Sequence, residues 1–246
     1  AAKKATALAA CSRHAAEKLA EPTRDEAKPL AEGFRAEKPR AVNSKNPLVF
    51  VCPVHYGKLP RIVAEFIEKT PFTGNKEAFF IVTCSGSAGS AEKQVLSLCN
   101  KKGFRFRGFL SLPMPENDII DKTATPKDKA AELIAKADET LERVAGQIHR
   151  NEMLRYEAPA GGAVSLMQKL FSPFKAGAKG FTADSRCDGC GKCAELCPVK
   201  NISLQGGKPQ WGDKCAQCTA CINGCPRGAI EFKNKTQGKE RYFFGQ

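Results

Sequence analysis

Apolar residues gather in short continuous runs through the first half of the chain, with amphipathic stretches between them. The runs "PLVFVCPV" at 47–54, "EAFFIVTC" at 77–84 and "FRFRGFLSL" at 104–112 are rich in β-branched and aromatic residues, which predicts buried strands. A shorter stretch, Lys3–Leu8, is also strand-like. Strands that are apolar throughout are typical of a parallel sheet covered on both faces.

The stretches between these runs have the spacing of amphipathic helices. Helices are predicted over 12–20, 61–69 and 90–102, with Ser90 as the N-cap of the third. A longer helix begins at Lys127, where apolar residues start to recur every three or four positions. These positions are Ala130, Leu133, Ile134, Ala137, Leu141, Val144 and Ile148. The alternation predicts an α/β fold on a doubly wound parallel sheet, in which ligands bind at the carboxyl ends of the strands.

Residues 151–182 are predicted to be a linker or an interdomain helix. Gly161-Gly162 and nearby prolines mark a boundary, so one domain is expected at 1–150 and a second at 183–246. The linker carries an apolar stripe of Val164, Leu166, Met167, Leu170, Phe171 and Phe174 beside several lysines. The stripe is expected to pack between the domains, although a helix on a membrane surface has the same composition.

Two cysteine motifs dominate the last third of the chain. "CDGCGKCAELCP" begins at Cys187 and "CAQCTACINGCP" begins at Cys215. In each motif, three cysteines are separated by two residues, a fourth follows after three more, and a proline comes next. Zinc sites usually combine two separated cysteine pairs, and disulfides need an oxidising compartment that no signal in this chain indicates. The spacing is that of bacterial ferredoxins with two [4Fe-4S] clusters.

In this pattern the fourth cysteine of each motif binds the other cluster. Cluster one is predicted to use Cys187, Cys190, Cys193 and Cys225, and cluster two Cys215, Cys218, Cys221 and Cys197. Gly189 and Gly191 lack side chains where backbone amides approach sulfur. The stretches 201–205 and 229–232 are predicted strands of a small α+β ferredoxin-like domain. Trp211 is expected to pack between its halves, with a part in electron transfer as the alternative.

The chain resembles, over almost its full length, the two-domain flavodoxin–ferredoxin family of anaerobic microbes. The resemblance rests on "SRHAAEKLAE", "PVHYGKLP", "TCSGSAG", "LPMPEND" and "WGDKCAQCTACINGCP". It implies a flavodoxin-like domain that binds FMN, fused to a bacterial two-cluster ferredoxin domain. The implied FMN residues are Ser12, Tyr56, Ser85, Gly86, Ser87 and Gly89. Tyr56 would stack on the flavin ring; an exposed loop tyrosine and an ordinary turn at 85–89 are the alternatives.

The first loop departs from the family pattern. Where the family has a phosphate loop rich in glycine and hydroxyl groups, this chain reads "ALAACSR", and only Ser12 supplies a hydroxyl. The amides and dipole of the helix that follows still provide an anion site. The first domain is therefore expected either to hold FMN or to be a flavodoxin scaffold that docks partners without it.

Charge and cysteine usage refine this interpretation. The formal net charge is +13, but lysine and arginine are scattered among acids, so no nucleic-acid partner is expected. Two clusters of about −2 each would lower the charge to about +9.

The residues Leu8–Cys11 resemble a lipoprotein cleavage box, but the apolar stretch before them is too short for a signal peptide. No run is long enough for a transmembrane segment, and a cytoplasmic protein is expected. Outside the motifs, Cys11, Cys52, Cys84 and Cys99 are expected to be buried thiols.

The expected function is electron transfer between low-potential redox partner proteins, through two [4Fe-4S] clusters and FMN. One alternative is a flavin-dependent reductase that uses the clusters as an internal wire, although the sequence shows no distinct acid–base pair for it. The other is a redox or docking subunit whose first domain lacks flavin. The sequence gives no indication of donor, acceptor, direction of flow or oligomeric state.

Overall fold

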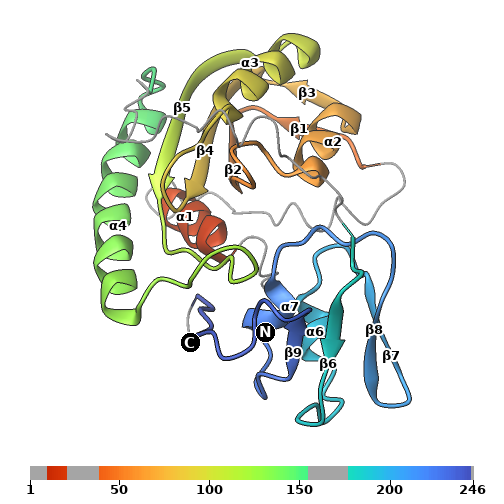
Figure 1. The fold of residues 1–246 in the computed structure, drawn as a ribbon. Coiled ribbons are helices and arrows are strands. Elements are labelled where there is room, and N and C mark those ends of the chain that lie inside the picture. Colours follow the sequence, from red (N-terminus) through yellow and green to blue (C-terminus); the bar gives the residue numbers. More distant parts are fainter. Residues whose placement is uncertain (1–9, 21–38, 155–176, 245–246) are drawn as a thin grey trace. The chain divides into compact units, whose positions relative to one another are not determined.

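The computed structural model describes residues 10–20, 39–154 and 177–244. They divide into two compact units, which are described separately (Figure 1). We call residues 11–20, 39–114 and 130–154 the sheet unit, and residues 115–129 and 177–244 the cysteine unit. The predicted strand at 3–8 and the apolar stripe at 164–174 lie outside the described residues. The domain limits expected from the sequence stay a prediction.

A parallel sheet of three strands forms the centre of the sheet unit. Its order is β2 (Leu48–Pro53), β4 (Glu77–Cys84), β5 (Arg105–Pro113). Phe50 pairs with Phe80, and Phe80 pairs with Phe109. Because these strands are parallel and alternate with helices, the α/β prediction is confirmed. Two three-residue strands that the sequence did not predict, β1 (Val42–Ser44) and β3 (Phe72–Gly74), also pair in parallel.

Helices lie on both faces of this sheet (Figure 1). They are α1 (Ala10–Ala20), α2 (Arg61–Lys69), α3 (Ala91–Lys102) and α4 (Lys127–His149). Val63 of α2 and Val95 of α3 belong to one buried cluster with Phe80 of β4. On the other face, α1 contacts β4 through its Ser12 hydroxyl, which lies 2.9 Å from the Thr83 hydroxyl. His14 of α1 is joined to Asp138 of α4 at 2.5 Å.

The prediction of Ser90 as an N-cap is correct in position and wrong in contact. Ser90 immediately precedes α3, but its side chain makes no capping hydrogen bond. The hydroxyl instead donates to the carbonyl of Gly57 at 3.2 Å, and the Ser90 amide donates to the same oxygen at 2.7 Å. The hydroxyl therefore joins the loops after β2 and β4, a contact between residues that are distant in the sequence.

The cysteine unit contains two antiparallel strand pairs and two short helices. The strands pair as β6 (Phe181–Ala183) with β9 (Ile230–Phe232), and β7 (Ile202–Gln205) with β8 (Lys208–Trp211). The helices are α6 (Lys192–Leu196) and α7 (Ala220–Asn223), each inside a cysteine motif. The strands predicted at 201–205 and 229–232 are present, and each pairs with a strand that the sequence did not predict. No helix among the described residues is long and apolar enough to span a membrane.

Candidate metal centre

The first three cysteines of one motif meet the last cysteine of the other around a single cavity. The cavity is partly open to solvent. Its lining includes Cys187, Cys190, Cys193 and Cys225. Leu204, Pro209 and Ile230 supply apolar lining. The structure thus brings together the four cysteines that the sequence assigned to cluster one.

The remaining four cysteines also gather together. Burial raises the pKa of Cys218 to about 12 and raises the pKa values of Cys215 and Cys221 as well. Cys197 and Cys221 belong to one buried cluster, and Cys215 packs against it. Repulsion from Cys197 raises the pKa of Cys215, Cys218 and Cys221 further. Around the first cavity, burial likewise raises the pKa of Cys193 to about 11, with smaller contributions from Cys225 and Cys187. Because metals bind thiolates, iron binding would displace protons from these buried thiols.

Backbone amides point at several of the sulfur atoms. The amide of Asn201 donates to Cys197 Sγ at 3.1 Å, and the amide of Ala229 donates to Cys225 Sγ at 3.4 Å. The amide of Gln217 donates to Cys215 Sγ at 3.4 Å. Amide donors of this kind stabilise negative charge on cluster sulfurs and set the reduction potential. The donor set therefore fits iron–sulfur clusters bound through thiolates.

The turn after Cys187 explains one of the glycines in the first motif. Gly189 has φ +74°, and a Cβ there would lie 2.7 Å from the carbonyl oxygen of Gly207. Any larger residue would combine an unfavourable backbone with a clash against the β7–β8 turn. The glycine lets the loop that carries Cys187 and Cys190 approach that turn closely.

The two groups of cysteines differ in exposure. In the first group Cys190 is exposed, Cys187 and Cys225 are half-buried and Cys193 is buried. In the second group Cys215 and Cys218 are half-buried, Cys197 and Cys221 are buried, and none is exposed. Cluster one would therefore lie closer to the surface of the cysteine unit than cluster two. Within the described residues, no three His, Cys, Asp or Glu side chains converge on a point that would hold a single metal ion. A cuboidal cluster does not require such convergence, because its four thiolates bind four different irons.

An ion pair stands at the rim of the first cavity. Arg227 Nε donates to Asp188 Oδ2 at 2.8 Å, and the Cys190 amide donates to Asp188 Oδ1 at 3.2 Å. The hydrogen bond from Arg227, followed by that of the Cys190 amide, lowers the pKa of Asp188 to about 2. This pair joins the turn of one motif to the residue that follows Pro226 in the other.

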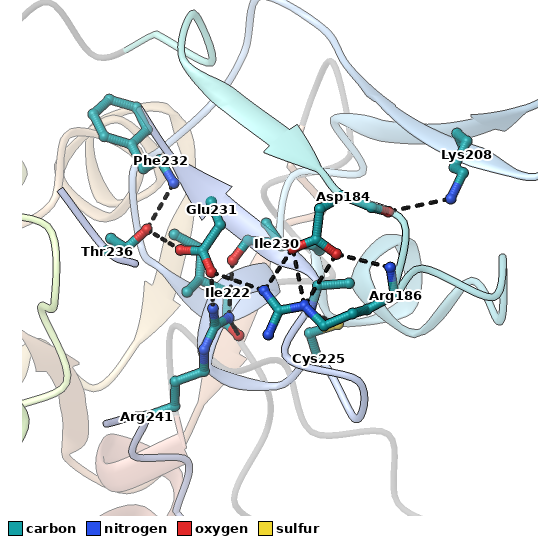
Figure 2. Close-up of polar contacts among 11 residues, drawn as sticks. Asp184, Arg186, Lys208, Ile222, Cys225, Ile230, Glu231, Phe232, Thr236 and Arg241 are labelled. Carbon is teal, nitrogen blue, oxygen red and sulfur yellow. Dashed lines mark hydrogen bonds and ion pairs between the residues drawn. The ribbon is translucent and has the colours of Figure 1, made fainter. Parts of the chain in front are cut away.

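A polar network supports the loop that carries Cys225 (Figure 2). Glu231, on β9, is buried and accepts hydrogen bonds from Arg241 at 2.8 Å and Arg186 at 3.2 Å. Arg241 also donates to the carbonyls of Ile222 and Ile230, at 2.8 and 2.9 Å. Arg241 therefore links the two ends of the 222–230 loop, in which Cys225 lies.

Residues 115–129 follow β5, include the start of α4 and pack as part of the cysteine unit. The carbonyl of Asn117 accepts hydrogen bonds from Thr219 Oγ1 at 3.2 Å and from Asn223 Nδ2 at 2.8 Å. Ile119 is fully buried in the same apolar cluster as Cys197 and Cys221. The stretch "LPMPEND" has no apolar periodicity that would indicate this packing.

Five of the six residues implied for FMN lie at the loops after β2 and β4, and the sixth, Ser12, lies on α1. Tyr56 is 58% exposed, and Ser85, Gly86, Ser87 and Gly89 are exposed on the neighbouring loop. The two loops touch, since a Cβ on Gly89 would lie 2.6 Å from Gly57 Cα. Ser12 differs from the others, because its side chain is buried and hydrogen-bonded to Thr83.

Cys52, Cys84 and Cys99 are buried, as predicted. Burial raises the pKa of Cys52 to about 12 and that of Cys99 to about 11, so both are unreactive thiols. The side chain of Cys11 is not among those described.

Comparison with known proteins supports the iron–sulfur assignment for the first motif. Residues 184–203 match the family model of the 4Fe-4S binding domain. The match includes Cys187, Cys190, Cys193 and Cys197, and indicates iron–sulfur electron transfer with at least one [4Fe-4S] cluster. No curated protein and no solved structure matches the chain.

Proposed function

We propose that the chain carries electrons through two [4Fe-4S] clusters whose ligands are exchanged between the motifs. One cluster is held by Cys187, Cys190, Cys193 and Cys225, and the other by Cys215, Cys218, Cys221 and Cys197. The observation that carries the proposal is the cavity lined by three cysteines of the first motif and Cys225 of the second. The amide of Ala229, directed at Cys225 Sγ, adds support because it would stabilise a bound thiolate.

Each cluster passes one electron at a time and makes or breaks no bond to a substrate. Because four cysteines are available to each cluster, no iron is left open for a substrate in this proposal. The exposure of Cys190 supports exchange of electrons with redox partner proteins on the side of cluster one. Cluster two, whose four cysteines include no exposed one, would then serve as the inner centre.

We also propose that the sheet unit has a flavodoxin-like fold and holds FMN at the loops after β2 and β4. Tyr56 and residues 85–89 would surround the flavin ring, and the contact between Gly57 and Gly89 supports this by joining the two loops. When bound, a flavin couples the one-electron steps of clusters to two-electron chemistry. One observation favours a docking unit without flavin instead: the buried Ser12 hydroxyl is already bonded to Thr83.

A reductive titration of the anaerobically purified chain tests this function. Dithionite is added stepwise, the cluster absorbance is followed, and flavin released by denaturation is measured in parallel. Two clusters take up about two electrons per chain, and two clusters with FMN take up about four. The reduced protein should be reoxidised by a one-electron acceptor such as ferricyanide. Two electrons without flavin would favour the docking unit, and fewer than two would contradict the two-cluster carrier.

A further inference from the structure

Cys225 differs from the other three ligands proposed for cluster one, because it comes from the second motif. It lies on the 222–230 loop, between α7 and β9. Its amide donates to the carbonyl of Ile222 at 3.4 Å, and the amide of Gly228 donates to the Cys225 carbonyl at 3.0 Å. Both hydrogen bonds are local to the loop. The position of Cys225 therefore depends on what holds the two ends of the loop.

Arg241 holds both ends with one side chain, as Figure 2 shows. Its Nη1 donates to the carbonyls of Ile222 and Ile230, at 2.8 and 2.9 Å, and its Nη2 donates to Glu231 Oε1 at 2.8 Å. A guanidinium can bind three acceptors at once because it is planar and carries five N–H donors. The Arg241 side chain is 17% exposed, so water competes little for these hydrogen bonds.

The residues that follow Arg241 hold its side chain against the loop. Tyr242 packs against the apolar cluster that contains Cys193. Phe243 packs against Leu196. A Cβ on Gly224, the residue before Cys225, would lie 3.1 Å from Phe243 Cε2. The chain after β9 thus returns to the loop and is packed on it, which fixes the place of the guanidinium.

The neighbouring ligand Cys221, proposed for cluster two, has a support of its own. It lies on α7, where the amide of Asn223 donates to the carbonyl of Thr219 and the amide of Gly224 donates to that of Ala220, both at 3.0 Å. These hydrogen bonds do not involve Arg241. Loss of the arginine should therefore displace Cys225 more than Cys221.

We propose that Arg241 is a positioning residue for Cys225: it holds the 222–230 loop where the thiolate can bind the fourth iron of cluster one. This rests on the proposed ligand set. Without Arg241, the bond between Cys225 and its iron breaks more readily, whereas the three cysteines of the first motif still hold the other irons. Oxidation then removes one iron from cluster one and leaves cluster two complete.

Oxidation of the anaerobically purified full chain with ferricyanide tests this. An oxidised [4Fe-4S]²⁺ cluster that releases Fe²⁺ and gives one electron to ferricyanide becomes [3Fe-4S]⁺, and the Cys225 thiolate is set free. EPR detects the [3Fe-4S]⁺ product, because its parent is diamagnetic. In Arg241→Gln the signal should form at least about tenfold faster than in the unsubstituted protein, roughly the effect of one lost hydrogen bond to a charged group. It should level off at about one spin per chain, because one cluster is affected.

Two further variants separate the hydrogen bonds of Arg241 from its charge. Arg241→Lys keeps a positive charge near Glu231 but not the planar set of donors, so it should also speed the conversion. It serves as the test if Arg241→Gln does not fold. Arg186→Gln is the matched control, because Arg186 donates to the same Glu231 carboxylate at 3.2 Å and otherwise to Asp184. Its side chain is 55% exposed, so its loss should change the rate by no more than about twofold.

Removal of the ligand itself shows whether Arg241 acts through Cys225. Cys225→Ala should produce a three-iron cluster one, and adding Arg241→Gln to it should change neither the iron content nor the [3Fe-4S] signal. Further loss of iron in the double variant would overturn the proposal, because Arg241 would then support cluster two or the fold. An unsubstituted rate in Arg241→Lys, or an equal acceleration in Arg186→Gln, would mean that Arg241 only balances the charge of Glu231.

Iron analysis of the unsubstituted protein separates these outcomes from failure of the proposed function. About eight irons per chain preserve the two-cluster proposal whatever the rates are, and about four contradict it.

Discussion

Glu231 is a buried carboxylate whose charge is balanced by two arginines. Its side chain is 8% exposed, and the side chain of its partner Arg241 is 17% exposed. Thr236 Oγ1 donates to the other carboxylate oxygen at 2.5 Å and accepts from the amide of Phe232 (Figure 2). These contacts tie β9 to Arg186 and to the chain that follows β9, at Thr236 and Arg241. Since β9 closes the loop of Cys225, we expect cluster retention to depend on Glu231.

Glu231→Gln should destabilise the native protein by roughly 3 kcal/mol. The amide keeps the shape of the carboxylate but removes its charge, which leaves Arg241 largely buried without a counter-ion. The measurement is the guanidinium concentration at which cluster absorbance is lost under anaerobic conditions. The midpoint should shift to a lower concentration.

Glu195→Gln is the matched control for this prediction. Glu195 lies in the same unit, and its side chain is 56% exposed beside Lys192. Exposed pairs of this kind contribute at most about 0.5 kcal/mol, so the control should leave the midpoint almost unchanged. Equal midpoints for the two variants would contradict the structural role of Glu231.

At the same scale, the sequence indicated which residues can carry chemistry but not their partners. The cysteine spacing is a local signal, and it gave the two groups that the structure brings together. Arg186 and Arg241, the ion-pair partners of Glu231, lie 45 and 10 positions away from it, and no local pattern announces either contact. Ser12 shows the converse: its hydroxyl was implied for FMN, and the structure pairs it with Thr83 across 71 positions.

Among the elements, residues 115–129 lead from β5 of the sheet unit into the start of α4. They nevertheless pack as part of the cysteine unit. Asn117 accepts two hydrogen bonds from around α7, and Lys239 Nζ donates to the carbonyls of Ile119 and Lys122 at 2.8 and 2.9 Å. Ile119 is buried with Cys197 and Cys221. We infer that this segment excludes water from Cys197 and Cys221.

Ile119→Ala should destabilise the cysteine unit by roughly 3 kcal/mol, the cost of a cavity at a fully buried isoleucine. Water admitted beside Cys197 and Cys221 should also speed the loss of iron. The measurement is the rate of decay of cluster absorbance in the presence of an iron chelator. Leu96→Ala, at a side chain 41% exposed on α3, is the control and should decay at the rate of the unsubstituted protein. Equal decay rates for both variants would contradict the proposal that Ile119 shields the cysteines from water.

Elements with a strong apolar pattern were predictable, and the others were not. The runs at 47–54, 77–84 and 104–112 became the parallel strands because each is largely apolar and bounded by turns. The strands β6 and β8 have three and four residues, too few to show a period, and they form only because partners lie beside them. The 115–129 segment has no period at all, and its hydrogen bonds and packing hold it in place.

The whole molecule joins two kinds of architecture in one chain. A parallel sheet covered by helices occupies the sheet unit, and the cysteine unit is built from short strands and two groups of four cysteines. Small units of this kind have little apolar core, so bound metal supplies part of the folding free energy. The folding of the cysteine unit therefore depends on what its cysteines bind.

Quantification of iron and acid-labile sulfide in the anaerobically purified full chain tests this most directly. Two [4Fe-4S] clusters predict about eight irons and about eight sulfides per chain, with no stoichiometric zinc. About four of each would leave one group of cysteines without a cluster. Zinc without sulfide would contradict the iron–sulfur account of both motifs.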